Sequence, residues 1–312
     1  MENLILSLNV VLPLFLMIVL GYGLKVLKIW DTHTINGMNT VVFKVFLPVL
    51  LFINVYQTDI AGVFNLKLML FAIFSVILIF LITWGIICLI EKENPKRGVL
   101  IQAIFRSNFV IFGIPIATSL CGAESTGAAA LLVAVIVPLF NVLAVITLET
   151  FRGSRIHVRK ILRGIVTNPL IIGSLLGLLF LAIGIKLPSA IEKTISDLSK
   201  VTTPLALVIL GASFTFSSVR GNLRNLCIGL LGKLVLAPVI FLPLAIMFDL
   251  KGTSLAILLA IFGSPPAVSS FSMAKQMDGD ADLAGQLVVF GSMFSVLTMF
   301  IWIFILTEGQ FI

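Results

Sequence analysis

The chain has 312 residues, of which 59% are hydrophobic and only 11% are charged. Soluble globular domains carry about 25% charged residues, so this composition excludes a soluble protein and predicts an all-α polytopic membrane protein. The net charge of +7 comes from lysines and arginines in short loops between apolar stretches. We therefore attribute the charge to membrane topology and expect no nucleic-acid partner.

Ten apolar stretches each come close to the ~20 residues that cross the hydrocarbon core of a bilayer. The first stretch lacks a basic region and a small-residue cleavage site, so we expect it to be a retained span and not a signal peptide. Short connections leave no room for a catalytic domain outside the membrane. The predicted spans are 4–27, 35–56, 66–90, 99–120, 126–148, 165–185, 199–219, 226–248, 253–274 and 283–307.

Residues that hold metals or carry out catalysis are few and scattered. The three cysteines are isolated, with no CxxC pair, and both histidines, His33 and His157, lie in loops. This distribution favours neither a disulfide framework nor a metal site, and it offers no His-based catalytic group. We expect no metal, no cofactor and no catalytic residue, and we expect that the chain is not an enzyme.

Basic residues are divided unevenly between the two sets of loops. One set carries most of the 21 lysines and arginines, and the most basic loop is 152–164. Because cytoplasmic loops are the basic ones, we predict that this set is cytoplasmic and that both termini lie outside, in a bacterial inner membrane. The loop 152–164 has a second interpretation, as a patch for anionic lipid or a partner.

The same loop separates two halves, 1–151 and 165–312, that have five predicted spans each. Halves with an odd number of spans that share a fold must be inverted in the membrane. Unusual residues recur 156 positions apart in the first two spans of each half: Pro13 and Pro169, Gly21 and Gly177, Lys44 and Lys200, Pro48 and Pro204. This recurrence predicts two inverted repeats of five helices.

Spans four and nine each carry a helix-breaking sequence, Gly113-Ile114-Pro115 and Gly263-Ser264-Pro265-Pro266. A broken helix survives in hydrocarbon only where protein or a water-filled cavity surrounds it. Paired breaks in two inverted halves predict crossed broken helices at a transporter's binding site. The other interpretation is that the prolines only kink two helices for packing.

Crossed half-helices favour an anionic ligand. Proline suits the first position of a helix, so Pro115 and either Pro265 or Pro266 are expected to open new half-helices. Their N-termini present free amide donors and partial positive charge to one cavity. We expect Asn108 to contact the ligand or to act as interhelical glue. The candidate substrate-binding residues are Asn108, Phe112, Gly113, Pro115, Ser264, Pro265, Pro266 and Ser269.

Charged residues sharpen this expectation. Arg106 lies near mid-depth in span four and either attracts an anionic substrate or extends its side chain to the cytoplasmic surface. Lys44 and Lys200 lie nearer span ends, where they either extend to the surface or act in a gate. None of the 14 acidic residues lies near the middle of a span, which favours an anion over a transported cation.

Five stretches resemble the auxin efflux carrier family in its bacterial form, and together they run the length of the chain. They are NTVVFKVFLPVLLF (39–52), FRSNFVIFGIPI (105–116), TNPLII (167–172), PLALVILGASF (204–214) and FGSPPAVSSFSMAKQMDGDADLAGQLV (262–288). The resemblance implies ten spans in two inverted repeats. Spans one, two, six and seven would form a scaffold, and spans three to five and eight to ten would form a mobile transport domain. Plant carriers have a long loop between spans five and six that this chain lacks, whereas bacterial relatives are usually assigned to malate, malonate or similar carboxylates.

We therefore predict a secondary transporter of small organic anions such as malate or malonate, working by alternating access around the crossed helices. Two alternatives stay open: a sodium-coupled organic-anion symporter of a related crossed-helix fold, and a membrane receptor that does not transport. The expected partners are the substrate anion and the lipid bilayer. A coupling proton or sodium ion and a homodimer are left open.

Overall fold

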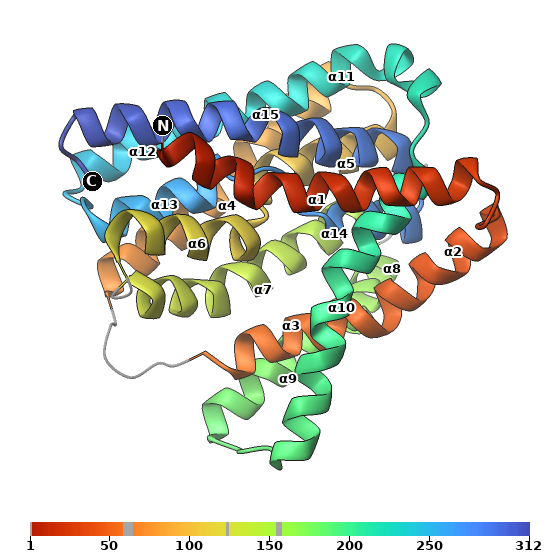
Figure 1. Ribbon diagram of the computed structural model, residues 1–312, viewed down its shortest axis with the longest axis horizontal. Coiled ribbons are helices and arrows are strands. Elements are labelled where there is room, and N and C mark those ends of the chain that lie inside the picture. Colours follow the sequence, from red (N-terminus) through yellow and green to blue (C-terminus); the bar gives the residue numbers. More distant parts are fainter. Residues whose placement is uncertain (1, 59–64, 123–124, 154–157) are drawn as a thin grey trace.

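The computed structural model describes residues 2–58, 65–122, 125–153 and 158–312, leaving aside the side chains of 2–11, 112–114, 116, 125–126, 158 and 160–161. Every regular element in these ranges is a helix (Figure 1). The first half contains α1 (Glu2–Val26), α2 (Thr32–Val41), the π-helical η1 (Val42–Phe46), α3 (Leu47–Tyr56), α4 (Leu66–Ile90), α5 (Asn94–Phe105), α6 (Phe109–Cys121) and α7 (Ser125–Phe151). The second half contains α8 (Val158–Val166), α9 (Pro169–Ile183), α10 (Ser189–Ser213), the 3-10 helix η2 (Phe216–Ser218), α11 (Val219–Leu231), the π-helical η3 (Gly232–Leu236), α12 (Ala237–Met247), α13 (Thr253–Gly263), α14 (Ser269–Gln276) and α15 (Ala281–Glu308).

Short polar side chains set where several helices begin. The carboxylate of Asp31 accepts a hydrogen bond from the backbone N–H of Thr34 at the start of α2, at 2.7 Å. Asn65, Asn168 and Asp280 cap α4, α9 and α15 in the same way. Each cap satisfies an amide that has no partner inside its own helix. The loops between the apolar stretches therefore carry the signals that define the helices.

Six helices among the described residues are long and apolar enough to cross a membrane: 32–56, 66–90, 127–151, 189–213, 216–247 and 281–308. Three further apolar helices, Leu12–Val26, Pro169–Ile183 and Thr253–Gly263, are shorter. The predicted spans four and nine are each divided into two helices, which accounts for part of the difference from ten. The chain is thus a multi-pass, all-helical membrane protein.

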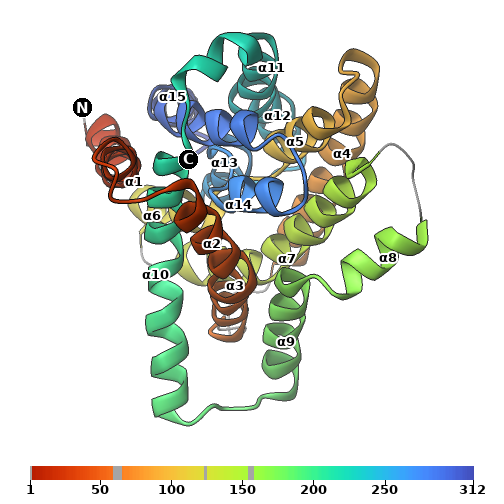
Figure 2. The same ribbon diagram turned by 90° about the vertical axis from the view of Figure 1, so that its right-hand side faces the viewer.

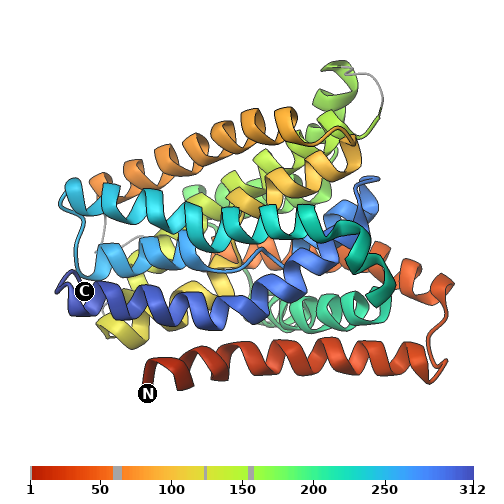
Figure 3. The same ribbon diagram turned by 90° about the horizontal axis from the view of Figure 1, so that it is seen from above.

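Glycines allow close approach of two helix pairs, α1 with α10 and α3 with α9. A methyl group at Gly21 of α1 would overlap the carbonyl oxygen of Val208 in α10, and one at Gly177 of α9 would lie 2.7 Å from the carbonyl oxygen of Phe52 in α3. Figure 2 shows α3 between α9 and α10, away from most of the other helices. Figure 3 shows the long helices α1, α4 and α15 running in roughly the same direction, with α1 and α4 on opposite edges of the bundle.

The break in span four lies earlier than the sequence indicates. Helix α5 ends at Phe105 and α6 begins at Phe109, so the irregular segment is Arg106-Ser107-Asn108. Pro115 lies inside α6 and is exposed, so the prediction that it opens a half-helix is wrong. A helix tolerates a proline when surroundings accommodate the one lost hydrogen bond. Three consecutive polar residues, Arg106 to Asn108, end α5. In contrast, Pro115 does not interrupt α6.

The break in span nine lies at Ser264 to Val268, as predicted, between α13 and α14. Pro265 and Pro266 fall within it, but neither is the first residue of a helix, because α14 begins only at Ser269. The basic loop 152–164 also differs from the prediction, since it contains the start of α8.

Candidate functional site

The two breaks lie against each other. The backbone N–H of Asn108 in the first break donates to the carbonyl oxygen of Pro265 in the second, at 2.8 Å. The side-chain amide of Gln102 in α5 donates to the carbonyl oxygen of Ser270 in α14, at 3.2 Å. Helix α6 packs along α13. Backbone groups that each break releases from its own helix are thus partly satisfied by the other, which lets irregular backbone persist inside the protein.

A cavity of about 320 Å³ opens beside the breaks. At roughly 30 Å³ for each water molecule, this volume equals about ten waters, enough for a small organic molecule. Its walls come from α3, α6, α7, α9, α10, the start of α14 and both breaks. The lining residues are Leu47, Leu50, Leu51, Asn54, Arg106, Ser107, Asn108, Phe109, Val110, Ile111, Val137, Phe140, Leu170, Ser199, Lys200, Thr202, Thr203, Ala206, Ala267, Val268 and Ser269.

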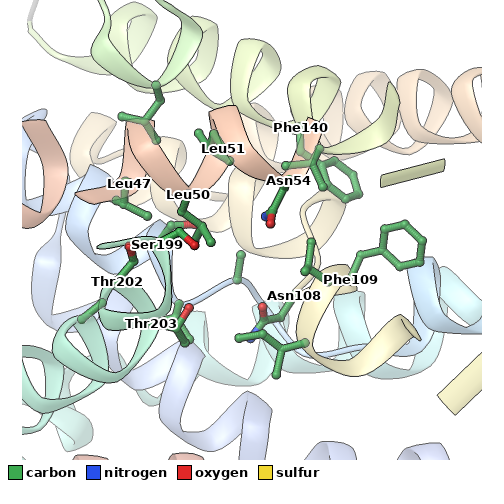
Figure 4. A pocket seen from close by; sticks show the side chains of 18 of the residues that line it. Leu47, Leu50, Leu51, Asn54, Asn108, Phe109, Phe140, Ser199, Thr202 and Thr203 are labelled. Atoms are coloured by element: carbon green, nitrogen blue, oxygen red, sulfur yellow. The ribbon is translucent and has the colours of Figure 1, made fainter. Parts of the chain in front are cut away.

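Polar groups face this cavity from opposite walls. Figure 4 shows Asn54 of α3 and Asn108 of the first break on two sides of it, with Ser199 and Thr203 of α10 along a third. Leucines and phenylalanines complete the walls. No aspartate or glutamate is among the described lining residues, whereas Arg106 and Lys200 are. The cavity can therefore offer hydrogen bonds and positive charge to a ligand, with no carboxylate to repel an anion.

Arg106 is the main source of that charge. Its side chain is only 4% exposed, so the interpretation that it extends to the cytoplasmic surface is wrong. Nη2 donates to Asn141 Oδ1 at 2.7 Å and to Ser269 Oγ at 2.8 Å, and Nη1 contacts Met273 Sδ at 2.6 Å. All three partners are neutral, and no ion pair to Arg106 occurs among the described residues. Three contacts hold the guanidinium in place while leaving its charge uncompensated.

Two helix N-termini also line the cavity. Helix α6 begins there with Phe109 and Val110, and its N-cap, Asn108, makes no side-chain capping bond. Helix α14 begins there with Ser269, after Val268. The first turn of a helix carries about half a unit of positive charge on its free N–H groups. Both ends therefore add to the positive potential that Arg106 creates.

Asn108 lies in the wall of the cavity. Its side chain lines the cavity and is largely buried. Within the described residues its Nδ2 has no hydrogen-bond partner. A buried amide donor without a partner costs about 1–3 kcal/mol, which a bound acceptor would recover. Both predicted roles of Asn108, ligand contact and interhelical glue, therefore stay open.

The other predicted residues divide into four groups. Ser269 and Lys200 line the cavity, although Lys200 also pairs with Asp197 at 3.0 Å on the surface. Ser264, Pro265 and Pro266 form the second break behind the cavity wall and are buried. Pro115 and Lys44 are exposed and do not line it. Phe112 and Gly113 lie in α6, and their side chains fall outside the described part of the structure.

Sequence reasoning missed several lining residues. Asn54 is an amide in an apolar span, the same signal that singled out Asn108, so it could have been found. Ser199, Thr202 and Thr203 precede Pro204 in α10 and are common residue types in membrane helices, so their types gave no signal. Asn141 of α7, another amide in an apolar span, accepts a hydrogen bond from Arg106.

Comparison with known proteins now identifies the family. A family model described as "Membrane transport protein" matches residues 6–303. The chain belongs to this family, the auxin efflux carriers. An uncharacterized transporter of Methanocaldococcus jannaschii is 25% identical over 310 residues, covering 96% of this chain and 98% of that protein. Another, of Methanothermobacter thermautotrophicus, is 24% identical over 304 residues, covering 95% and 97%. Membership establishes a membrane-embedded transporter with a transported substrate.

Proposed function

We propose that this carrier is a secondary transporter of small organic anions, carboxylates such as malate or malonate, which it binds in the cavity beside the two breaks. The observation that carries the proposal is Arg106, a buried guanidinium with neutral partners only. An unpaired charge in the interior is costly, and a carboxylate entering the cavity lowers that cost. Guanidinium and carboxylate also match geometrically, since two parallel N–H···O bonds can form.

We propose that ten spans in two inverted repeats build this site. Contacts related by 156 positions support the repeat. Gly21 approaches Val208, and Gly177 approaches Phe52. Gly177 lies 156 positions after Gly21, and Val208 lies 156 positions after Phe52, so the repeat relates the two contacts to each other. The hydroxyl of Thr202 donates to the carbonyl oxygen of Phe46, its own counterpart, at 3.1 Å. A contact between counterparts is expected where a two-fold axis passes through the molecule.

Alternating access then follows from two bodies that meet at the cavity. We propose that α1, α2, α3, α9 and α10 form a scaffold, and that α4 to α7 with α11 to α15 form the moving domain. Tight packing within the α1–α10 and α3–α9 pairs supports the first body. The cavity wall contains residues from both bodies, so relative movement would change its access.

Two polar contacts join the bodies at one end of the molecule. Lys275 of α14 donates to Ser213 Oγ of α10 at 3.0 Å, and Gln276 donates to Thr40 Oγ1 of α2 at 2.8 Å. With the basic loops in the cytoplasm and both termini outside, these contacts lie at the cytoplasmic end. The proposed state is therefore closed to the cytoplasm, with the cavity toward the outside.

Transport in proteoliposomes tests the function. Purified protein would be reconstituted, and uptake or solid-supported-membrane currents would be recorded for a panel of mono- and dicarboxylates, with neutral and cationic compounds of similar size as controls. We expect saturable signals for at least one carboxylate and none for the cations. A folded preparation that gives no signal with any anion would refute the proposal.

A further inference from the structure

A second buried cation lies behind the cavity. Lys233 is in η3, between α11 and α12, and its side chain is 0% exposed. Its ammonium Nζ donates to the carbonyl oxygen of Ile261, in the last turn of α13, at 3.3 Å. Among described side chains, Arg106 and Lys233 are the only lysines or arginines in the buried class. Lys233 has no part in lining the cavity, so its burial calls for a separate reason.

The tandem prolines explain why the Ile261 carbonyl is available. In an α-helix the carbonyl of residue 261 accepts from the N–H of residue 265, and that of residue 262 from residue 266. Pro265 and Pro266 have no N–H, so both carbonyls lose their regular donor. The neighbouring carbonyl of Ala260 receives the hydroxyl of Ser264. The buried end of α13 thus has two carbonyl groups, at Ile261 and Phe262, without their regular donor, and carbonyl oxygens are ligands suited to a monovalent cation.

No acidic group among the described residues pairs with Lys233. Helices α12 and α13 carry no titratable residue. The titratable residues of the other packed helices lie toward helix ends, apart from Cys227: Lys96 and Arg97 on α5, Arg220, Arg224 and Cys227 on α11, and Asp282 and Glu308 on α15. The negative end of the α13 dipole and its free carbonyls are therefore what Lys233 meets.

We propose that the carbonyl end of α13 is a monovalent-cation site whose permanent occupant is the Lys233 ammonium. A tethered cation at this position holds the second break in the shape that presents Pro265 to Asn108. The site then needs no sodium ion from solution, and anion transport proceeds without sodium. Removing the side chain should open the site to a small free cation of the ammonium or alkali class.

Thermal unfolding of the purified protein tests the site without any substrate. Lys233→Ala leaves both the carbonyls and the space, whereas Lys233→Met fills the space with an uncharged chain. We expect both to lower the unfolding midpoint by roughly 5 °C, because a buried carbonyl loses its donor. Methylammonium at about 100 mM should restore much of this loss in Lys233→Ala, relative to choline, and none in Lys233→Met. Lys67→Ala, a change at an exposed lysine, serves as the matched control.

A transport measurement adds a second arm, which rests on the proposed function. Wild-type uptake should be equal in sodium and in choline buffers, and methylammonium should raise the uptake of Lys233→Ala. Sodium-dependent wild-type uptake would overturn the proposal, and so would equal methylammonium effects on the Ala and Met variants. If wild type carries no anion at all, the proposed function fails, but the unfolding measurements still decide the role of Lys233.

Discussion

The two helix breaks touch each other, yet different chemistry makes them. The first has three polar residues, Arg106 to Asn108, with no proline, and its own arginine faces the cavity. The second has two adjacent prolines, no charge of its own, and a lysine supplied by another helix. On the two proposals made above, the first break serves a ligand that enters the cavity, and the second is held by the Lys233 ammonium, which stays in place. This difference separates ligand binding from structural support.

The largest effect is expected at Arg106. Arg106→Gln keeps an amide that can still donate to Asn141 or Ser269, but it removes the charge. A hydrogen bond to a charged group contributes about 1.5–3 kcal/mol, so substrate affinity should fall roughly 10- to 150-fold. Uptake against substrate concentration measures this change, with the unfolding midpoint recorded alongside. Arg220→Gln, the same change at an exposed arginine, should leave affinity unaltered. Unchanged substrate affinity in Arg106→Gln would mean that Arg106 does not bind the substrate and that both breaks serve only to support the structure.

Asn108 should separate affinity from stability in the same way. Asn108→Ala removes an amide whose Nδ2 has no partner among the described residues, so folding loses little. Substrate loses a hydrogen bond, and we expect affinity to fall by about 1 kcal/mol, or roughly fivefold. Binding isotherms with the unfolding midpoint measured on the same preparation report both quantities. A large fall in the midpoint with intact affinity would return Asn108 to the role of interhelical glue.

Pro265 and Pro115 should behave differently, because only Pro265 lies in a break. Pro265→Ala restores an N–H that can compete with Lys233 for Ile261, so it should slow transport several-fold by straightening the second break. Pro115→Ala supplies a donor inside α6, away from the break, and should be neutral or stabilise by up to about 1 kcal/mol. Transport rates and unfolding midpoints of the two variants test this. Comparable loss of transport in both would restore Pro115 as a functional break.

The smallest effect concerns Glu91, which follows α4 and joins the turn between α4 and α5 to α11. Its Oε2 accepts from Asn225 Nδ2 at 2.6 Å, and its Oε1 accepts from the N–H groups of Lys92 and Glu93. Burial raises the pKa of the Glu91 carboxyl, but the hydrogen bonds from Glu93, Asn225 and Lys92 outweigh it and lower the pKa below its ordinary value.

A lowered pKa means that this stabilisation is present above the unfolded value of 4.5 and is lost as pH falls through the folded pKa. Glu91→Gln should lower the unfolding midpoint by roughly 2–4 °C at pH 7, and the difference from wild type should shrink toward pH 4. Unfolding curves over this pH range measure it. A difference that grows on acidification would contradict the assigned sign.

Sequence reasoning located the second break correctly because two adjacent prolines, Pro265 and Pro266, remove two consecutive donors from one helix. It placed the first break about two turns too late, since Pro115 was the only helix breaker visible there. Whether a polar triplet ends a helix depends on what surrounds it, here the Pro265 carbonyl and the cavity. The same limit explains Lys233: hydropathy shows a lysine in a span, but only packing reveals that it reaches an orphaned carbonyl. Hydrophobic length was informative, and α4 has the bounds predicted for span three.

A comparison between the binding of a carboxylate and the binding of its own amide tests the central claim most directly. Malonate and malonamide share a carbon skeleton and differ in charge, so each mono- or dicarboxylate of a panel would be titrated beside its amide on wild type and Arg106→Gln. The account predicts saturable binding of at least one carboxylate to wild type, much weaker binding of its amide, and loss of this preference in Arg106→Gln. Equal binding of acid and amide, or an unchanged preference in the variant, would contradict it.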